Sequence, residues 1–399
     1  MGDTQKHTKP NVPNLRFPGF EGEWESCELG EIAEFSKGAG ISKDQRSSDG
    51  NPCILYGELY TTYLTEIIDE VVSKTNLDPT GLVRSKANDI IIPASGETAI
   101  DISTARCVLQ NDVLLGGDLN IIRLFNQDGR FFSYQLNGIR KKDIARIAHG
   151  VSIVHLHGNA LSHITVNYPS RSEQEKISSL LSLIDQRIAI QNKVIEDLKC
   201  VKDSITRRLI NKKDESSCIV TLGEITEIVS RRNKSKVNYP MYSVTNDKGF
   251  VPQQEQFGDR EMVGEDIGAY KIVLKDEIAY NPARINVGSI GQYTGDSPCM
   301  ISSLYVCIKA RKEIDSKWLI QILRSEHLIY YYNLFAEGGV RLYLFYPNFS
   351  RIRVTLPPLE QQSRIAAILG QIENKIELES SILSGYKQTK QALLCKLFV

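Results

Sequence analysis

The sequence predicts an α+β protein with two mixed α/β domains in a pseudo-two-fold arrangement, separated by two long antiparallel coiled-coil helices. Three observations predict this class. Segments of the first half recur in order in the second half, each half contains short strand-like runs, and each half ends in a long apolar heptad pattern. The expected boundaries are a lead-in at 1–23, mixed domains at 24–170 and 214–356, and helical spacers at 171–213 and 357–399.

The internal repeat rests on four matched segments. The matches are Leu29–Ile32 with Leu222–Ile225, Asn88–Ile90 with Lys275–Ile278 (Asp89 aligned with Asp276), His149–Val151 with Gly338–Val340, and Val166–Pro169 with Val354–Pro357. The last match sets an offset between the two halves, and this offset then continues without a gap through both helical tails. A shared order and a gapless tail are poorly explained by chance, so the chain is interpreted as a tandem duplication.

The helical tails carry the clearest periodic signal. Apolar residues step alternately by four and three, which is the seam of a coiled coil. The spacer positions are Ile177, Leu181, Ile184, Ile188, Ile195 and Leu198 in the first tail, and Ile365, Leu369, Ile372, Ile376, Leu383 and Leu393 in the second. Polar breaks match as well, at Gln191 with Glu379 and at Lys202 with Lys390. Each helix is about 34 residues, roughly 50 Å long; the repeat order favours antiparallel pairing, since periodicity alone gives no orientation.

The mixed domains are predicted from short β-branched runs set between Gly, Asn, Asp and Pro. Examples are Asp89–Ile92, Tyr305–Ile308 and the alternating run Val151–His157. Short helices are expected near 131–139 and 316–324.

Composition narrows the class of protein further. No run of about 18 apolar residues exists, and Met1–Pro13 lacks an apolar signal core, so neither a membrane span nor secretion is expected. The eight cysteines are scattered without a Cys-x-x-Cys pair, as in a cytoplasmic protein with reduced thiols. Formal net charge is zero, so a nucleic-acid binder of this composition has to concentrate Lys and Arg locally.

No catalytic or metal-binding motif emerges from the residues. A Gly-x-x-x-x-Gly-Lys-Ser/Thr loop is absent. Asn281-Pro282-Ala283-Arg284 resembles the Asn-Pro-Pro-aromatic turn of DNA adenine methyltransferases but lacks the second Pro and the aromatic residue. His155 and His157 share one face of a predicted strand, but no third metal ligand follows nearby. The pattern favours binding over catalysis.

Three groups of polar residues occupy matching places in the two halves and suit contact with phosphates and base edges. The first is basic and comprises Lys37, Lys43 and Arg46, matched by Arg231, Arg232, Lys234 and Lys236. The second comprises Tyr56 and Tyr60, matched by Tyr242 and Asn246, and the third comprises Ser95, matched by Asn281, Arg284 and Asn286. These loops differ between the halves while the helices match. Two domains that recognise different DNA sequences on one scaffold explain this contrast. Divergence of surface loops after duplication explains it equally.

The residues resemble a known family over nearly the whole chain. The most specific elements are the lead-in Asn14–Phe20 with Trp24, the two Leu-Gly-Glu-Ile openings, the run Pro357–Gln362 entering a helix, and the ending Leu393–Val399. In the first half the Pro-Pro-Leu-Glu-Gln-Gln run is degraded to Pro169-Ser170-Arg171-Ser172-Glu173-Gln174. The chain is similar to the specificity subunit of type I restriction–modification systems, the HsdS family.

The resemblance implies a division of labour between subunits. Each mixed domain is then a target recognition domain that reads one half of a bipartite, asymmetric site in double-stranded DNA. Two modification (methyltransferase) subunits use S-adenosylmethionine to methylate adenine, and two restriction (motor–nuclease) subunits use ATP and Mg²⁺. No cofactor and no catalytic activity are expected in this chain.

Two other interpretations remain open at the level of sequence. A duplicated coiled-coil adaptor that joins proteins lacks salt-dependent DNA binding. A fused enzyme with an unrecognised nuclease or methyltransferase site turns over DNA when supplied with Mg²⁺ and S-adenosylmethionine.

Overall fold

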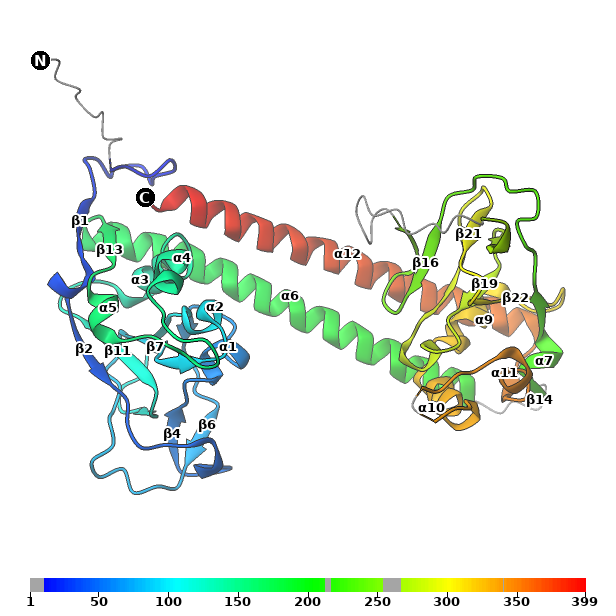
Figure 1. The fold of residues 1–399 in the computed structure, drawn as a ribbon, viewed down its shortest axis with the longest axis horizontal. Coiled ribbons are helices and arrows are strands. Elements are labelled where there is room, and N and C mark those ends of the chain that lie inside the picture. The colour runs from blue at the N-terminus through cyan, green and yellow to red at the C-terminus, as the bar shows by residue number, and fades with distance from the viewer. Residues whose placement is uncertain (1–10, 212–216, 254–266, 340) are drawn as a thin grey trace, which may run out of the picture. The chain divides into compact units, whose positions relative to one another are not determined.

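The computed structural model describes residues 11–211, 217–253, 267–339 and 341–399. The chain forms two compact units, Met1–Asn192 with Ser381–Val399, and Lys193–Ser380. We call them unit 1 and unit 2. Each unit contains one mixed domain and a section of each of two long helices, α6 (Arg171–Asn211) and α12 (Leu359–Leu397), as Figure 1 shows.

The mixed domain of unit 1 is built on a five-stranded sheet. Its strand order is β2 (Ala33–Lys37), β11 (Leu119–Leu124), β7 (Asp89–Pro93), β9 (Arg106–Val108) and β5 (Ile67–Ile68). Ile90 and Ile92 face one hydrophobic cluster, and Ile91 faces another. Because both faces of the sheet are covered, β7 is a continuous apolar run and not an alternating one.

Smaller elements surround this sheet. A second sheet has the order β10 (Leu114–Leu115), β4 (Asn51–Ile54), β6 (Ser73–Thr75), β3 (Arg46–Ser47), and two-stranded pairs join β1 (Glu25–Glu28) to β13 (Thr165–Tyr168) and β8 (Ser95–Gly96) to β12 (Val154–His155). The short helices are η1 (Leu29–Glu31), η2 (Lys43–Gln45), α1 (Glu58–Thr61), α2 (Ala99–Ile102), α3 (Gly129–Asn137), α4 (Lys141–Arg146) and α5 (Gly158–Ser162).

The mixed domain of unit 2 repeats this plan with fewer strands in its main sheet. That sheet has the order β15 (Thr226–Val229), β22 (Val306–Ala310), β19 (Ile278–Tyr280), β20 (Ile290–Gln292). Pairs join β14 (Cys218–Thr221) to β23 (Arg353–Leu356), β16 (Tyr242–Thr245) to β17 (Gly249–Pro252), and β18 (Lys271–Val273) to β21 (Cys299–Ile301). The short helices are α7 (Leu222–Ile225), η3 (Ile267–Ala269), η4 (Ile285–Val287), α9 (Ser316–Leu323), α10 (Glu326–Phe335) and α11 (Tyr346–Phe349).

The long helices run antiparallel. In unit 1 the early part of α6 meets the late part of α12 through Asp185 and Lys390, and in unit 2 the late part of α6 meets the early part of α12 through Lys202 and Glu373. All of the predicted spacer residues are buried or half-buried. The predicted α+β class, with two mixed domains and two long antiparallel helices, is confirmed. The helices are longer than expected, 41 and 39 residues.

The structure corrects the sequence alignment of the two halves at two places. Asp89 accepts from the backbone N–H of Lys86 and pairs with Arg123, whereas Glu277 accepts from Leu274 and pairs with Arg231. The equivalent of Asp89 is therefore Glu277 and not Asp276. The offset that relates the helical tails thus holds already at this strand.

The second correction concerns the glycine hairpins. Gly150 has φ +129° and follows the bridge from His149 to His155, while Gly338 has φ +137° and follows the bridge from Glu337 to Tyr343. Gly150 therefore matches Gly338, again at the offset of the helical tails. Val340 of the predicted match lies outside the described residues. The strand expected over 151–157 is also wrong, since only Val154–His155 pairs as a strand.

Candidate nucleic-acid interface

A buried glutamine joins each mixed domain to the helix that follows it. The Gln174 side chain accepts from the backbone N–H of Asp128 at 3.0 Å and donates to the carbonyl of Pro169 at 2.8 Å. Gln362 makes the same two bonds, to Asp315 at 2.9 Å and Pro357 at 2.9 Å. We call this contact the glutamine junction.

The glutamine junction fixes the mixed domain to the long helix, because the aspartate that donates to the glutamine also caps a helix of the domain. Asp128 caps α3 and Asp315 caps α9, each through a side-chain oxygen. Both glutamines are almost fully buried, so their amide groups are satisfied inside the protein and not by water. The degraded first copy of the Pro-Pro-Leu-Glu-Gln-Gln run thus retains the residue that makes the contact.

The lead-in is tied to the same region of unit 1. Arg16 forms a two-point ion pair with buried Glu173, at 2.9 and 2.8 Å. Trp24 packs edge-on against Phe131 and Phe398. These contacts explain why the lead-in, the start of α6 and the chain ending carry specific sequence elements.

In unit 2, three predicted residues from two separate loops line one cleft. The cleft has a volume of about 510 Å³, and Asn246, Asn281 and Arg284 lie on its wall. Asn281 holds its own loop, because its side-chain oxygen accepts from the N–H of Ala283. Asn246 and Arg284 are exposed. The cleft therefore presents an amide and a guanidinium, groups that suit hydrogen bonding to base edges.

Two residues outside the predicted set complete this cleft. The Tyr305 hydroxyl accepts from the backbone N–H of Val244 at 3.3 Å, and Ser289 donates to the carbonyl of Val244 at 2.7 Å. These bonds hold β16 against the connection between β19 and β20 and against the residue that precedes β22. In the sequence Tyr305 belongs only to a strand-like run, and no local pattern marks it as a positioning residue.

One member of the basic cluster of unit 2 forms an ion pair with a nearly buried carboxylate. Arg231 binds the carboxylate of Glu277 through both terminal nitrogens at 3.2 Å, so its charge is largely matched. The backbone of Arg232 forms a β-bridge with Lys271, whose amine donates to the carbonyl of Tyr305 at 2.6 Å. Arg232, Lys234 and Lys236 are exposed. Through Lys271 and Tyr305, the basic cluster adjoins the cleft.

Two predicted residues of unit 2 contact other side chains of the domain. The Tyr242 ring packs against Phe250 and Tyr293, with centroids 6.4 and 5.5 Å away. Asn286 donates from its amide to the side-chain oxygen of Asn333 at 2.9 Å. Neither lines the cleft, so both shape the loops around it.

In unit 1 the matching loops also come together. A Cβ placed on Gly57 or Gly96 lies 3.8 or 3.7 Å from the Tyr60 hydroxyl, so this ring links the loop 56–60 with the loop 93–98. Arg46 lies 3.5 Å from Glu58 in the first of these loops. Burial raises the pKa of the Tyr60 phenol. Tyr60 therefore remains a neutral hydrogen-bonding group at neutral pH.

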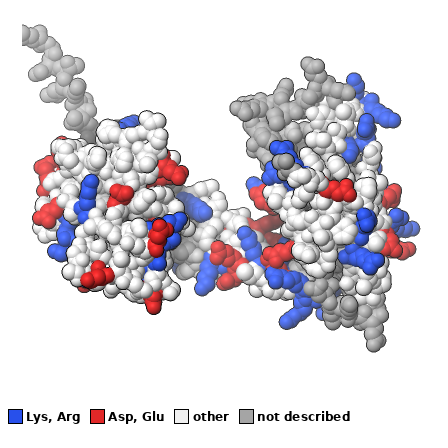
Figure 2. Space-filling view, turned by 60° about the horizontal axis from the view of Figure 1, so that its bottom comes forward, with Lys and Arg blue, Asp and Glu red and all other residues white. Residues whose placement is uncertain are grey.

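The other predicted residues of unit 1 are less concentrated. Lys37 and Lys43 are exposed and Tyr56 is half-buried, whereas Ser95 is buried in the pair of β8 with β12. The Ser95 side chain is thus not on the surface. Figure 2 shows Lys and Arg interspersed with Asp and Glu on the visible face, with no single basic field.

Two further features bear on the class of protein. Within the described residues, no group of three His, Cys, Asp or Glu side chains is placed to hold a metal ion. Across the same residues, no helix is both long and apolar enough to span a membrane.

Comparison with known proteins identifies the family. The family model described as type I restriction modification DNA specificity domain matches residues 21–199 and 216–385. The type I restriction enzyme MjaVIII specificity subunit of Methanocaldococcus jannaschii is 23% identical over 93% of this chain and 91% of its own length. The putative MjaX specificity subunit of the same organism is 21% identical over 44% of each chain.

Solved structures share the fold. A type I restriction–modification S subunit from M. genitalium has a TM-score of 0.65 and 17% identity, covering 97% of this chain and 99% of that one. A chain from a structural study of type I complex assembly and conformational transition has a TM-score of 0.56 and 16% identity, with the same coverage. The chain belongs to this family: it is a type I restriction–modification specificity subunit with two DNA specificity domains.

Proposed function

We propose that each mixed domain reads one half of a bipartite, asymmetric DNA site and that this chain catalyses nothing itself. The recognition domains are taken as 24–170 and 214–356, with the helical spacers at 171–213 and 357–399. Partner subunits methylate adenine with S-adenosylmethionine or translocate and cleave DNA with ATP and Mg²⁺. The observation that carries the proposal is the cleft of unit 2, where separate loops bring Asn246, Asn281 and Arg284 together.

The side chains divide into two roles. Arg284 and Asn246 are assigned to base edges, because a guanidinium or an amide can form paired hydrogen bonds in the major groove. Exposed Arg232, Lys234, Lys43 and Lys37 are assigned to phosphates, which fix register without reading sequence. Lys236 is assigned to the same phosphate group by position.

The remaining predicted residues position these groups. Arg231 and Tyr242 hold β15, β16 and their neighbours, and Ser95 is enclosed in a strand pair. In unit 1, Arg46, Tyr56 and Tyr60 are assigned to base reading, because Tyr60 joins both loops.

The long helices offer a surface for the modification subunits. Ile190 on α6 is 58% exposed and Leu378 on α12 is 55% exposed, and the two residues occupy equivalent positions of the repeat. We assign these two exposed apolar side chains to the docking of the modification subunits, because they occupy the same position in both copies of the repeat. Two copies of one modification subunit, one per repeat, suit such a repeated feature.

A domain exchange tests the proposal. Residues 218–356 are replaced by the corresponding segment of another family member, and the chain is expressed with its modification subunits. Sequencing of methylated host DNA is expected to show a change in one half of the motif only. A change in both halves of the motif contradicts modular reading. A methylated motif that is unchanged by the exchange supports an adaptor that does not read DNA.

The absence of catalysis has its own test. The purified chain alone, incubated with DNA, Mg²⁺ and S-adenosylmethionine, is expected to transfer no methyl group and cut no strand. Turnover that follows the chain through purification contradicts the proposal.

A further inference from the structure

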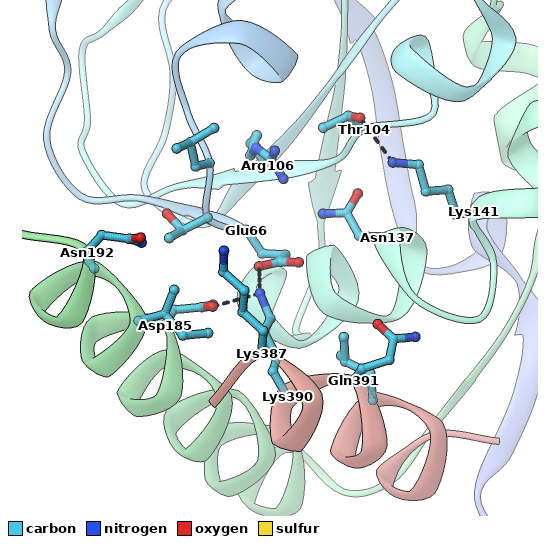
Figure 3. Close-up of a pocket in the computed structure, with 15 residues that line it drawn as sticks. Glu66, Thr104, Arg106, Asn137, Lys141, Asp185, Asn192, Lys387, Lys390 and Gln391 are labelled. Carbon is cyan, nitrogen blue, oxygen red and sulfur yellow. Dashed lines mark hydrogen bonds and ion pairs between the residues drawn. The ribbon is translucent and has the colours of Figure 1, made fainter. Parts of the chain in front are cut away.

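A cationic cavity in unit 1 lies apart from the predicted reading loops. It has a volume of about 410 Å³ and is formed by β9, the loop before β5, the end of α3, the start of α4, and the two long helices. Figure 3 shows Arg106 and Lys141 on one side and Lys387 and Lys390 reaching from α12 on the other.

Charge in the cavity is not balanced. Four cations line it, Arg106, Lys141, Lys387 and Lys390, against two carboxylates, Glu66 and Asp185. Lys390 uses both carboxylates, at 2.6 Å from Glu66 and 2.7 Å from Asp185. The other three cations are thereby left without an ion pair among the described residues.

Arg106 is the group that most needs a partner. Only 8% of the residue is exposed. Nε donates to the carbonyls of Leu59 and Tyr63 at 3.1 Å, and Nη1 donates to that of Ala105 at 3.2 Å. No acceptor in the described part of the chain bonds Nη2, which carries two further donors. Arg106 lines the cavity, so an anion there can accept from the free donors of its guanidinium.

Lys141 adds a second positive charge nearby. Within the part of the chain that the structure describes, its amine bonds only the Thr104 hydroxyl, at 3.5 Å. Burial lowers the pKa of the Lys141 amine, and the charge of Arg106 lowers it further. Burial likewise lowers the pKa of the Arg106 guanidinium. An anion placed between Arg106 and Lys141 stabilises the charged form of both side chains.

The matching cavity of unit 2 lacks this surplus. It has a volume of about 450 Å³, and its charged lining is Lys199, Lys202 and Arg324 with Asp203, Asp247, Glu373 and Glu377. Three cations there face four carboxylates. The surplus is therefore a property of unit 1 and not a consequence of the shared fold.

We propose that the unit 1 cavity binds an oxyanion, a phosphate or carboxylate group, held by Arg106, Lys141 and Lys387. The guanidinium supplies a fixed fork for two oxygens, and the two amines supply further charge-assisted hydrogen bonds. Ile188 and Ala189 of α6 form an apolar wall beside the molecule or side chain that carries the oxyanion. The group comes either from a free small molecule or from an acidic side chain of a docked subunit. The inference does not depend on which residues read DNA.

Calorimetric titration of the full chain with inorganic pyrophosphate, at constant ionic strength, tests the site. The wild-type chain is expected to bind one equivalent saturably. Lys387→Ala is expected to weaken binding at least about tenfold, since one charge-assisted bond is lost. Lys387 is exposed on a helix and makes no ion pair within the described residues, so alanine there preserves the fold.

Lys199→Ala is the matched control, because Lys199 is the equivalent of Lys387 and lines the balanced cavity. It is expected to change pyrophosphate affinity by less than about twofold. Absence of saturable binding to the wild-type chain overturns the proposal. Equal weakening by the two variants also overturns it, because such binding is only general attraction to surface charge.

Repeating the titration on the assembled modification complex distinguishes the sources. Binding that persists assigns the site to a free phosphate-bearing molecule. Binding that is lost, together with a larger loss of assembly in Lys387→Glu than in Lys199→Glu, assigns it to a carboxylate of the docked subunit. Equal effects of these two reversals contradict the subunit source and leave a free oxyanion as the ligand.

Discussion

Unit 1 and unit 2 have the same contacts between the mixed domain and its long helix, whereas their exposed loops differ. Both have the glutamine junction, and both place a lysine of one long helix against an acid of the other. The outward loops differ in sequence and in which groups they expose. Buried polar contacts have to be satisfied as a set, whereas exposed loops tolerate change. The duplication therefore fixes the scaffold and leaves the reading surface free to diverge.

The two helix-to-helix lysines are alike in position and unequal in surroundings. Lys390 meets two nearly buried carboxylates and lies 5.5 Å from the ring of Tyr134. Among the described carboxylates, Lys202 pairs with Glu373 alone, at 2.5 Å, and that pair is about a quarter exposed. The inequality gives the largest predicted difference between the units.

Lys390→Met is expected to lower the free energy of unfolding by about 3–5 kcal/mol, because Glu66 and Asp185 lose their cation inside the protein. Lys202→Met is expected to cost about 1 kcal/mol, since its pair is partly screened by water. Urea unfolding followed by circular dichroism measures both. Equal losses of unfolding free energy contradict the claim that the surroundings of Lys390 and Lys202 differ electrostatically.

The glutamine junction predicts a loss of similar size in both units. Gln362→Ala and Gln174→Ala each leave a buried N–H and a buried carbonyl without partners, at a cost of about 2–4 kcal/mol. Gln371→Ala, at an exposed position of α12, is the control and is expected to be near neutral. If only one junction variant is destabilised, the junction is not a shared structural element.

The reading loops predict effects confined to one half of the DNA site. Arg284→Ala is expected to relax one base position by about 1–3 kcal/mol and leave the other half unchanged. Competition binding of the complex to single-base variants measures it. Arg351→Ala, exposed in the same domain and away from the cleft lining, serves as control. Relaxed base specificity in the other half-site contradicts the assignment of Arg284 to a single half-site.

Phosphate contacts predict the smallest and least selective change. Lys234→Ala in unit 2 and Lys43→Ala in unit 1 are expected to weaken binding to all sequences alike and to reduce the salt slope by about 1. Lys142→Ala, also exposed, is the comparison variant. Binding of the complex measured across salt concentrations gives the slope. A sequence-dependent effect reassigns these lysines to base reading.

Much of the scaffold was predictable because periodicity reports burial. The heptads located the two helices, and every predicted spacer residue is buried or half-buried. Alignment of the halves failed by one position at Asp89 and Gly150, since an identical neighbouring residue in the sequence favoured the wrong register. The strand over 151–157 failed because a glycine with positive φ turns the chain there.

The site was less predictable because loop residues acquire roles from distant partners. Asn246 and Arg284 are far apart in the sequence and meet only through the strands that carry them. Tyr305 precedes β22 and accepts a hydrogen bond from β16, and Ser95 is buried although its neighbours suggest a surface turn. No local sequence pattern contains those contacts.

The motif methylated in a host that expresses this chain with its modification subunits tests the central claim most directly. Sequencing of modified bases is expected to give two unlike short half-sites separated by unread base pairs, with one methylated adenine on each strand. The motif is expected to disappear when this chain is omitted. A continuous palindrome, or methylation that persists without the chain, contradicts two domains reading two half-sites.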